Sequence, residues 1–123
     1  MLAEVKKISA EPTKSIALVD ARPPKRYTDG HIAGAHPIYW QDTLVDAKNK
    51  PVFLPADKLK ELFAARGVEP GEKLITYCEI GLQASHMYFV AKYLGYDAAM
   101  FDGSIHEWSH MNNLPLVKGT ALR

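Results

Sequence analysis

Short apolar runs alternate with longer amphipathic segments along this chain of 123 residues. The short runs are typical of buried strands, and they predict strands at residues 15–20, 35–39, 74–77 and 98–101. Apolar residues at helical spacing, with proline or glycine at the segment ends, predict helices at residues 23–29, 55–66, 83–94 and 105–110. Residues 49–51 are expected to lie in an irregular stretch.

Strands separated by helical segments favour a parallel sheet that is covered by helices on both faces. In such folds ligands bind at the carboxyl ends of the strands. Asp20, Cys78 and Asp102 each stand at or directly after the end of a predicted strand. We therefore expect these three residues to share one edge of the sheet.

The composition narrows the class of protein. A hydrophobic fraction of 47% suits one domain with a real core, and a net charge of +1 indicates no nucleic-acid partner. No apolar run approaches the length that crosses a membrane. One cysteine forms no internal disulfide and lacks the spacing of a zinc site. We expect a soluble cytoplasmic protein without metal or cofactor.

Cys78 is the strongest functional candidate, because the lone cysteine lies where a strand gives way to a helix. Backbone N–H groups of the loop and of the first helical turn favour an anion at this position, and therefore a thiolate. No Lys or Arg stands between Lys73 and Lys92, so the stretch around Cys78 carries no positive side chain of its own.

Three sequence blocks carry a resemblance to a known family. They are Val19-Asp20-Ala21-Arg22 with the later Gly30-His31-Ile32-Ala33-Gly34-Ala35, then Cys78-Glu79-Ile80-Gly81-Leu82-Gln83-Ala84-Ser85, and Phe101-Asp102-Gly103-Ser104-Ile105-His106-Glu107-Trp108. Their order, separations and position around the single cysteine resemble the rhodanese, or sulfurtransferase, domain.

The resemblance implies a rhodanese-like α/β fold with a five-stranded parallel sheet flanked by helices on both faces. It implies one domain over residues 1–123, either standing alone or forming one half of a longer tandem protein. Cys78 would be the nucleophile and would carry a persulfide. The anion cradle and substrate contacts would come from Glu79, Ile80, Gly81, Leu82, Gln83, Ala84 and Arg22. Structural support would come from Asp20, His31, Asp102 and Glu107.

Two residues of the cysteine loop leave the identity of the sulfur donor undecided. Glu79 opposes a dianionic donor if it points inward, although an ionised side chain at a loop tip is expected to point to water. Gln83 donates hydrogen bonds but supplies no charge. Thiosulfate and a persulfide or polysulfide thus receive nearly equal weight as donors. The acceptor is cyanide, a small thiol, thioredoxin or another acceptor protein.

Two other classes of function are weighed against a sulfurtransferase. A phosphatase of the related fold needs a longer cysteine loop ending in an arginine that grips phosphate, and residues 78–83 contain no arginine. A binding or regulatory module that keeps the fold without sulfur transfer usually loses the cysteine, which this chain keeps. The cysteine therefore favours an enzyme or a sulfur-relay domain, and it leaves a redox sensor as an alternative.

Overall fold

The computed structural model describes residues 2–10, 16–46, 48–69, 72–79, 82–101 and 103–119. The helical elements are α1 (Leu2–Ala10), α2 (Pro24–Asp29), the short η1 (Trp40–Thr43), α3 (Ala56–Ala65), α4 (Leu82–Tyr93) and the π-helix η2 (His106–Met111). The strands are β1 (Ile16–Asp20), β2 (Ala35–Pro37), β3 (Leu44–Asp46), β4 (Lys50–Phe53), β5 (Lys73–Tyr77) and β6 (Asp97–Met100).

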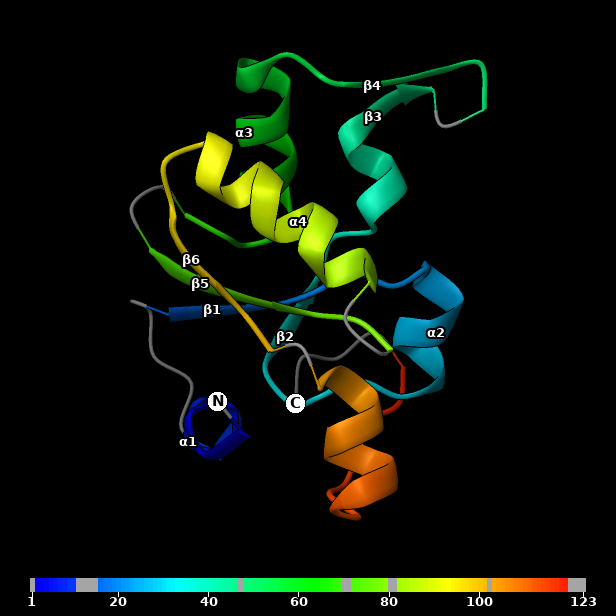
Figure 1. The fold of residues 1–123 in the computed structure, drawn as a ribbon, viewed down its shortest axis with the longest axis vertical. Helices are drawn as coiled ribbons and strands as arrows, with labels where there is room; N and C mark the ends of the chain where they lie inside the picture. The colour runs from blue at the N-terminus through cyan, green and yellow to red at the C-terminus, as the bar shows by residue number, and fades with distance from the viewer. Residues whose placement is uncertain are drawn as a thin grey trace.

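Four strands form a parallel sheet in the order β2-β1-β5-β6 (Figure 1). In the central pair, Leu18 lies opposite Ile75 and Asp20 lies opposite Tyr77. The carboxyl ends of β1 and β5 therefore reach the same edge of the sheet, which confirms that Asp20 and Cys78 share it. Asp102, the third residue expected there, lies outside the described residues.

The prediction of a fifth parallel strand is wrong, because the parallel sheet contains four strands among the described residues. The other two described strands, β3 and β4, pair antiparallel with each other in a sheet of their own. Parallel neighbours need a crossover on the order of a dozen residues or more, whereas residues 47–49 alone separate these strands. Asp46 Oδ1 closes the turn by accepting the N–H groups of Lys48 and Asn49 at 2.9 and 3.0 Å. Lys50 and Val52 are thus in a strand, where an irregular stretch was expected around residue 50.

Two apolar clusters cover the two faces of the parallel sheet. On one face, Leu59 and Phe63 of α3 pack with Met87 of α4 against the sheet. On the other face, side chains from α1, α2 and η2 pack together, among them Ile8 and Trp108. Because successive strand residues point to opposite faces, Ala17 and Val19 belong to the first cluster and Leu18 to the second. The expectation of a parallel sheet flanked by helices is confirmed.

The helices that periodicity predicted are present with small shifts at their ends. The sequence analysis predicted neither α1 nor η1, although Leu2, Val5 and Ile8 of α1 stand three residues apart along the chain. Helix α1 buries Val5 and Ile8 against the sheet, and its Glu4 carboxylate pairs with Lys73 Nζ of β5 at 3.0 Å.

Among the described residues, no helix combines the length and the apolar character needed to cross a membrane.

Phe63 and Phe89 make a matched pair for testing this core. Phe63 is fully buried between α3 and the sheet, whereas Phe89 of α4 is 56% exposed. We expect Phe63→Ala to lower the free energy of unfolding by about 3–5 kcal/mol through lost burial and the cavity left behind. Phe89→Ala should cost much less, about 1 kcal/mol or below. Urea unfolding monitored by circular dichroism measures both, and equal losses would contradict the assigned packing.

Candidate active site

Cys78 follows β5 directly and is held through its backbone. Its side chain and backbone together are 1% exposed. The Cys78 N–H donates to Ser104 Oγ at 2.9 Å, and the Cys78 carbonyl accepts the Ile105 N–H at 3.0 Å. The segment that follows β6 therefore fixes the position from which the thiol emerges.

Ser104 is a site residue that the sequence analysis did not single out. Its hydroxyl accepts from Cys78 and donates to the Phe101 carbonyl at 2.8 Å, so one side chain joins the ends of β5 and β6. The backbone of Ser104 has a φ of 52°, in the left-handed region that non-glycine residues seldom adopt. The signal available in the sequence was a small polar residue in the turn directly after a predicted strand.

The loop from Cys78 to Gln83 is tied at both ends. Thr76 Oγ1 of β5 donates to the Ala84 carbonyl in α4 at 2.9 Å, which bridges the two elements that the loop connects. The Glu79 carbonyl accepts the His106 N–H at 2.9 Å. Gln83 is half-buried in the first turn of α4. Ile80 and Gly81, expected in the anion cradle, lie outside the described residues, and α4 begins at Leu82.

A buried ion pair stands beside this loop at the end of β1. Arg22 Nη2 lies 2.8 Å from Asp20 Oδ2, with side chains 3% and 0% exposed. Arg22 Nε also donates to both Asp20 oxygens, and Nη2 donates to the Gly30 carbonyl at 2.6 Å. Burial alone would lower the pKa of Arg22, but the hydrogen bonds and charge of Asp20 raise it, so the guanidinium stays protonated.

Glu79 connects the cysteine loop to this ion pair. Arg22 Nη1 lies 3.1 Å from Glu79 Oε1, and the Glu79 side chain is 44% exposed. The carboxylate therefore has one side in solvent, as expected for a loop tip, while one oxygen faces the buried guanidinium. Two carboxylates share one cation here, so Arg22 has little positive charge left to offer a substrate anion.

Two further side chains hold the end of β1 and the segment after α2. Tyr77 donates its hydroxyl to Asp20 Oδ2 at 2.8 Å and accepts the Ile32 N–H at 3.1 Å. Burial, and then the charge of Asp20, raises the pKa of Tyr77 well above its ordinary value, so the phenol stays neutral. His31 is fully buried, stacks on Tyr27 at 3.7 Å between ring centroids, and its Nδ1 lies 2.9 Å from the Tyr27 carbonyl.

Glu107, the remaining residue expected to give structural support, packs against the turn before η2. Its backbone N–H donates to the Gly103 carbonyl at 2.9 Å. A Cβ atom at Gly103 would come within 2.6 Å of the Glu107 Cβ, so this close approach requires glycine.

A groove of about 240 Å³ opens next to Glu79. It lies between α2 and η2, and its charged wall residues include Arg26 and Asp29 as well as Arg22 and Glu79. Arg26 is exposed, and among the described residues its guanidinium forms no ion pair. Arg26 of α2 thus offers the groove an uncommitted positive charge. The sequence analysis did not single it out, although it is a basic residue on the helix predicted at residues 23–29.

The geometry places one cysteine at the carboxyl edge of a parallel sheet, beside a loop braced by Ser104 and Arg22. The sequence model of the family described as the rhodanese-like domain matches residues 1–111. The chain belongs to the rhodanese-like domain family.

Curated relatives of this rhodanese-like domain include proteins named for sulfur transfer. A thiosulfate sulfurtransferase from Corynebacterium glutamicum is 35% identical over 92 residues, which cover 73% of this chain and 29% of that protein. The sulfur carrier protein TtuD from Thermus thermophilus is 32% identical over 121 residues, which cover 84% of this chain and 41% of that protein. The chain spans less than half the length of these relatives.

The fold agrees with this assignment. The anaerobic ergothioneine biosynthesis enzyme from Chlorobium limicola, solved with trimethyl histidine, matches with a TM-score of 0.82 over 96% of this chain and 31% of that chain. The wild-type structure of EanB matches with a TM-score of 0.81 over 95% of this chain and 30% of that chain. Sequence identity is 20% in both cases, a level at which the likeness speaks for the fold of this rhodanese-like domain alone.

Arg22 and Arg26 provide a matched test of the buried ion pair. We expect Arg22→Gln to lower the free energy of unfolding by about 3–5 kcal/mol, because the fully buried Asp20 carboxylate loses its charge partner. Arg26→Gln removes the same charge from an exposed site and should change stability by about 0.5 kcal/mol or less. Chemical unfolding at neutral pH measures both. A small loss in Arg22→Gln would show that the pair does not hold this edge.

Proposed function

We propose that this rhodanese-like domain is a sulfurtransferase that carries a sulfane sulfur on Cys78. The observation that supports this most directly is the placement of the chain's single cysteine. It lies at the carboxyl edge of the sheet, with its backbone fixed by Ser104 and Ile105. Relatives named for sulfur transfer add support.

In the first half-reaction, the Cys78 thiolate attacks the outer sulfur of the donor. With thiosulfate, the new bond joins Cys78 Sγ to that sulfur, the sulfur–sulfur bond of the donor breaks, and sulfite leaves with the electron pair. With a persulfide donor, a thiolate leaves instead. Backbone N–H groups of the loop and the positive end of α4 would stabilise the resulting persulfide anion.

In the second half-reaction, a thiophilic acceptor attacks the terminal sulfur of the persulfide. The bond between the two sulfurs breaks, and its electron pair returns to Cys78 as a thiolate, so no external oxidant or reductant is consumed. Cyanide would leave as thiocyanate, and a thiol would leave as a new persulfide. The relative named as a sulfur carrier protein supports including a protein among the candidate acceptors.

The charges around the groove bear on the choice of donor. Arg22 is committed to Asp20 and Glu79, so we assign it to holding the loop. Arg26 is the cation of the groove available to an anionic donor, and Glu79 opposes it. This balance gives a dianion such as thiosulfate modest attraction, which keeps a persulfide donor in consideration.

Intact-mass measurement tests the proposed carrier. The folded, reduced protein is incubated separately with thiosulfate and with glutathione persulfide, and excess donor is removed. We expect a gain of one sulfur atom, which cyanide then removes with formation of thiocyanate. Cys78→Ser should show no gain, because no other cysteine is present. An unmodified mass with both donors, in a protein shown to be folded, would refute the proposal.

The role of Arg26 is tested by steady-state kinetics with thiosulfate and cyanide. We expect Arg26→Gln to raise the KM for thiosulfate about fivefold with kcat little changed, since one charge interaction at a partly exposed site is worth about 1 kcal/mol. Glu79→Gln should lower that KM. Lys58→Gln, which removes an exposed charge from α3, is the matched control and should leave the KM unchanged. An unaltered KM in Arg26→Gln would contradict this assignment.

A further inference from the structure

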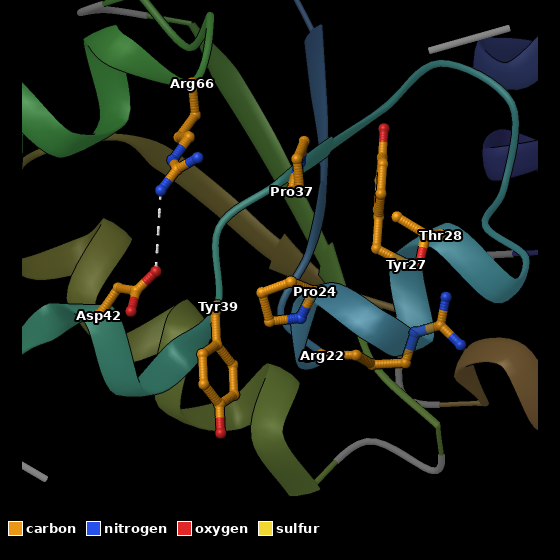
Figure 2. Close-up of a pocket in the computed structure, with 8 residues that line it drawn as sticks. All are labelled: Arg22, Pro24, Tyr27, Thr28, Pro37, Tyr39, Asp42 and Arg66. Atoms are coloured by element: carbon orange, nitrogen blue, oxygen red, sulfur yellow. Dashed lines mark ion pairs between the residues drawn. The ribbon is translucent and has the colours of Figure 1, made fainter. Parts of the chain in front are cut away.

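A second cavity, of about 290 Å³, lies beside β2, the outermost strand on one side of the parallel sheet. Its walls come from α2, from the end of β2 and the segment into η1, and from the residue that follows α3 (Figure 2). The residues that line it are Arg22, Pro24, Tyr27, Thr28, Pro37, Tyr39, Asp42 and Arg66. Of these residues, the proposed sulfur-transfer site uses only Arg22.

One end of this cavity carries two opposite charges that are only loosely paired with each other. Arg66 Nη2 and Asp42 Oδ2 face each other at 3.8 Å, and both side chains are 44% exposed (Figure 2). That distance is longer than a charge-assisted hydrogen bond, which lies near 2.7–2.9 Å. Among the described residues, neither charged group makes a hydrogen bond. The guanidinium and the carboxylate thus keep their hydrogen-bonding capacity for a ligand.

The rest of the cavity is largely apolar. Pro24 and Pro37 contribute ring carbons, and Tyr27 contributes its ring while its hydroxyl donates to the Ala35 carbonyl at 2.7 Å. The Thr28 hydroxyl likewise donates to a backbone carbonyl, that of Lys25, at 3.0 Å. Arg22 also lines the cavity, but its guanidinium is bound to Asp20, Glu79 and the Gly30 carbonyl. The charges that are not committed elsewhere therefore lie at the Asp42–Arg66 end, and the proline and tyrosine walls suit a short apolar or thioether side chain.

We propose that this cavity binds a small molecule that presents an α-amino-carboxylate. Its carboxylate would form paired hydrogen bonds with the Arg66 guanidinium, and its ammonium would donate to Asp42. Inserting this zwitterion replaces one long, exposed ion pair, which contributes little by itself, with two charge-assisted contacts. The side chain of the ligand would lie against Pro24, Pro37 and Tyr27.

The size of the cavity limits the ligand. Pockets for drug-sized molecules span roughly 300–1,000 Å³, so a cavity of about 290 Å³ suits a single amino acid or one end of a larger compound. A free amino acid and the γ-glutamyl end of glutathione share the α-amino-carboxylate group. The proposal does not depend on sulfur transfer by Cys78.

The test uses S-methyl-L-cysteine, whose blocked sulfur does not react with Cys78. Two analogues each lack one charge: 3-(methylthio)propanoate has no ammonium, and 2-(methylthio)ethylamine has no carboxylate. Binding is followed by chemical shifts of the backbone amides of Thr28, Tyr39 and Asp42, which come from different walls. We expect saturable shifts with the amino acid and affinities about tenfold weaker or more with each analogue. S-methylglutathione shows whether the cavity prefers a free amino acid or the γ-glutamyl end of glutathione. If it shifts the same amides and binds more tightly than S-methyl-L-cysteine, the γ-glutamyl end is the preferred ligand.

Three variants complete the design. Arg66→Gln and Asp42→Asn should each weaken binding of S-methyl-L-cysteine about tenfold or more, and Arg66→Gln should bring the amino acid and its amine analogue to similar affinity. Lys58→Gln removes an exposed charge from α3 outside the cavity and should bind as the wild type does. Thermal unfolding verifies that all three are folded. Absence of saturable shifts, equal affinities for the three thioethers, or wild-type binding by Arg66→Gln and Asp42→Asn would overturn the proposal.

Discussion

The buried pair of Asp20 and Arg22 is the interaction around which this edge of the sheet is organised. Removing both ionised groups from water costs several kcal/mol for each, and that cost is met only when every hydrogen-bonding position is used. Arg22 meets the requirement by donating to Asp20, to the Gly30 carbonyl and to Glu79. The pair therefore joins the end of β1, the end of α2 and the cysteine loop in one network.

This network has a chemical consequence for the site. Because Arg22 is shared between two carboxylates, it orients the loop that carries Cys78 more than it attracts an anion. The side of the loop facing η2 is held independently, through the Ser104 hydroxyl and the first N–H groups of η2. A residue that presents a reactive atom needs such fixed supports, since a positional error of about 1 Å can cost two orders of magnitude in rate.

The two cavities on either side of α2 differ in character. The groove beside Glu79 is lined by charges of both signs, and Glu79 directly follows the candidate nucleophile in the chain. The cavity over β2 is mostly apolar, with one half-exposed ion pair at its end. Arg22 lines both. The small helix α2 thus separates the groove that we propose for the sulfur donor from the cavity that we propose for an amino-acid head group.

The sequence by itself determined the features that depend on neighbours along the chain. The pattern of apolar residues located all four parallel strands and helices α3 and α4, and the strand-to-helix junction singled out Cys78. Contacts between distant segments were decided by the tertiary structure. Glu79 contacts Arg22, which lies 57 positions away in the chain, and Ser104 contacts Cys78, which lies 26 positions away. No local sequence pattern encodes contacts between residues so far apart. Likewise, β3 and β4 became a separate hairpin because their short turn forbids a crossover, whatever a family resemblance implies about the strand count.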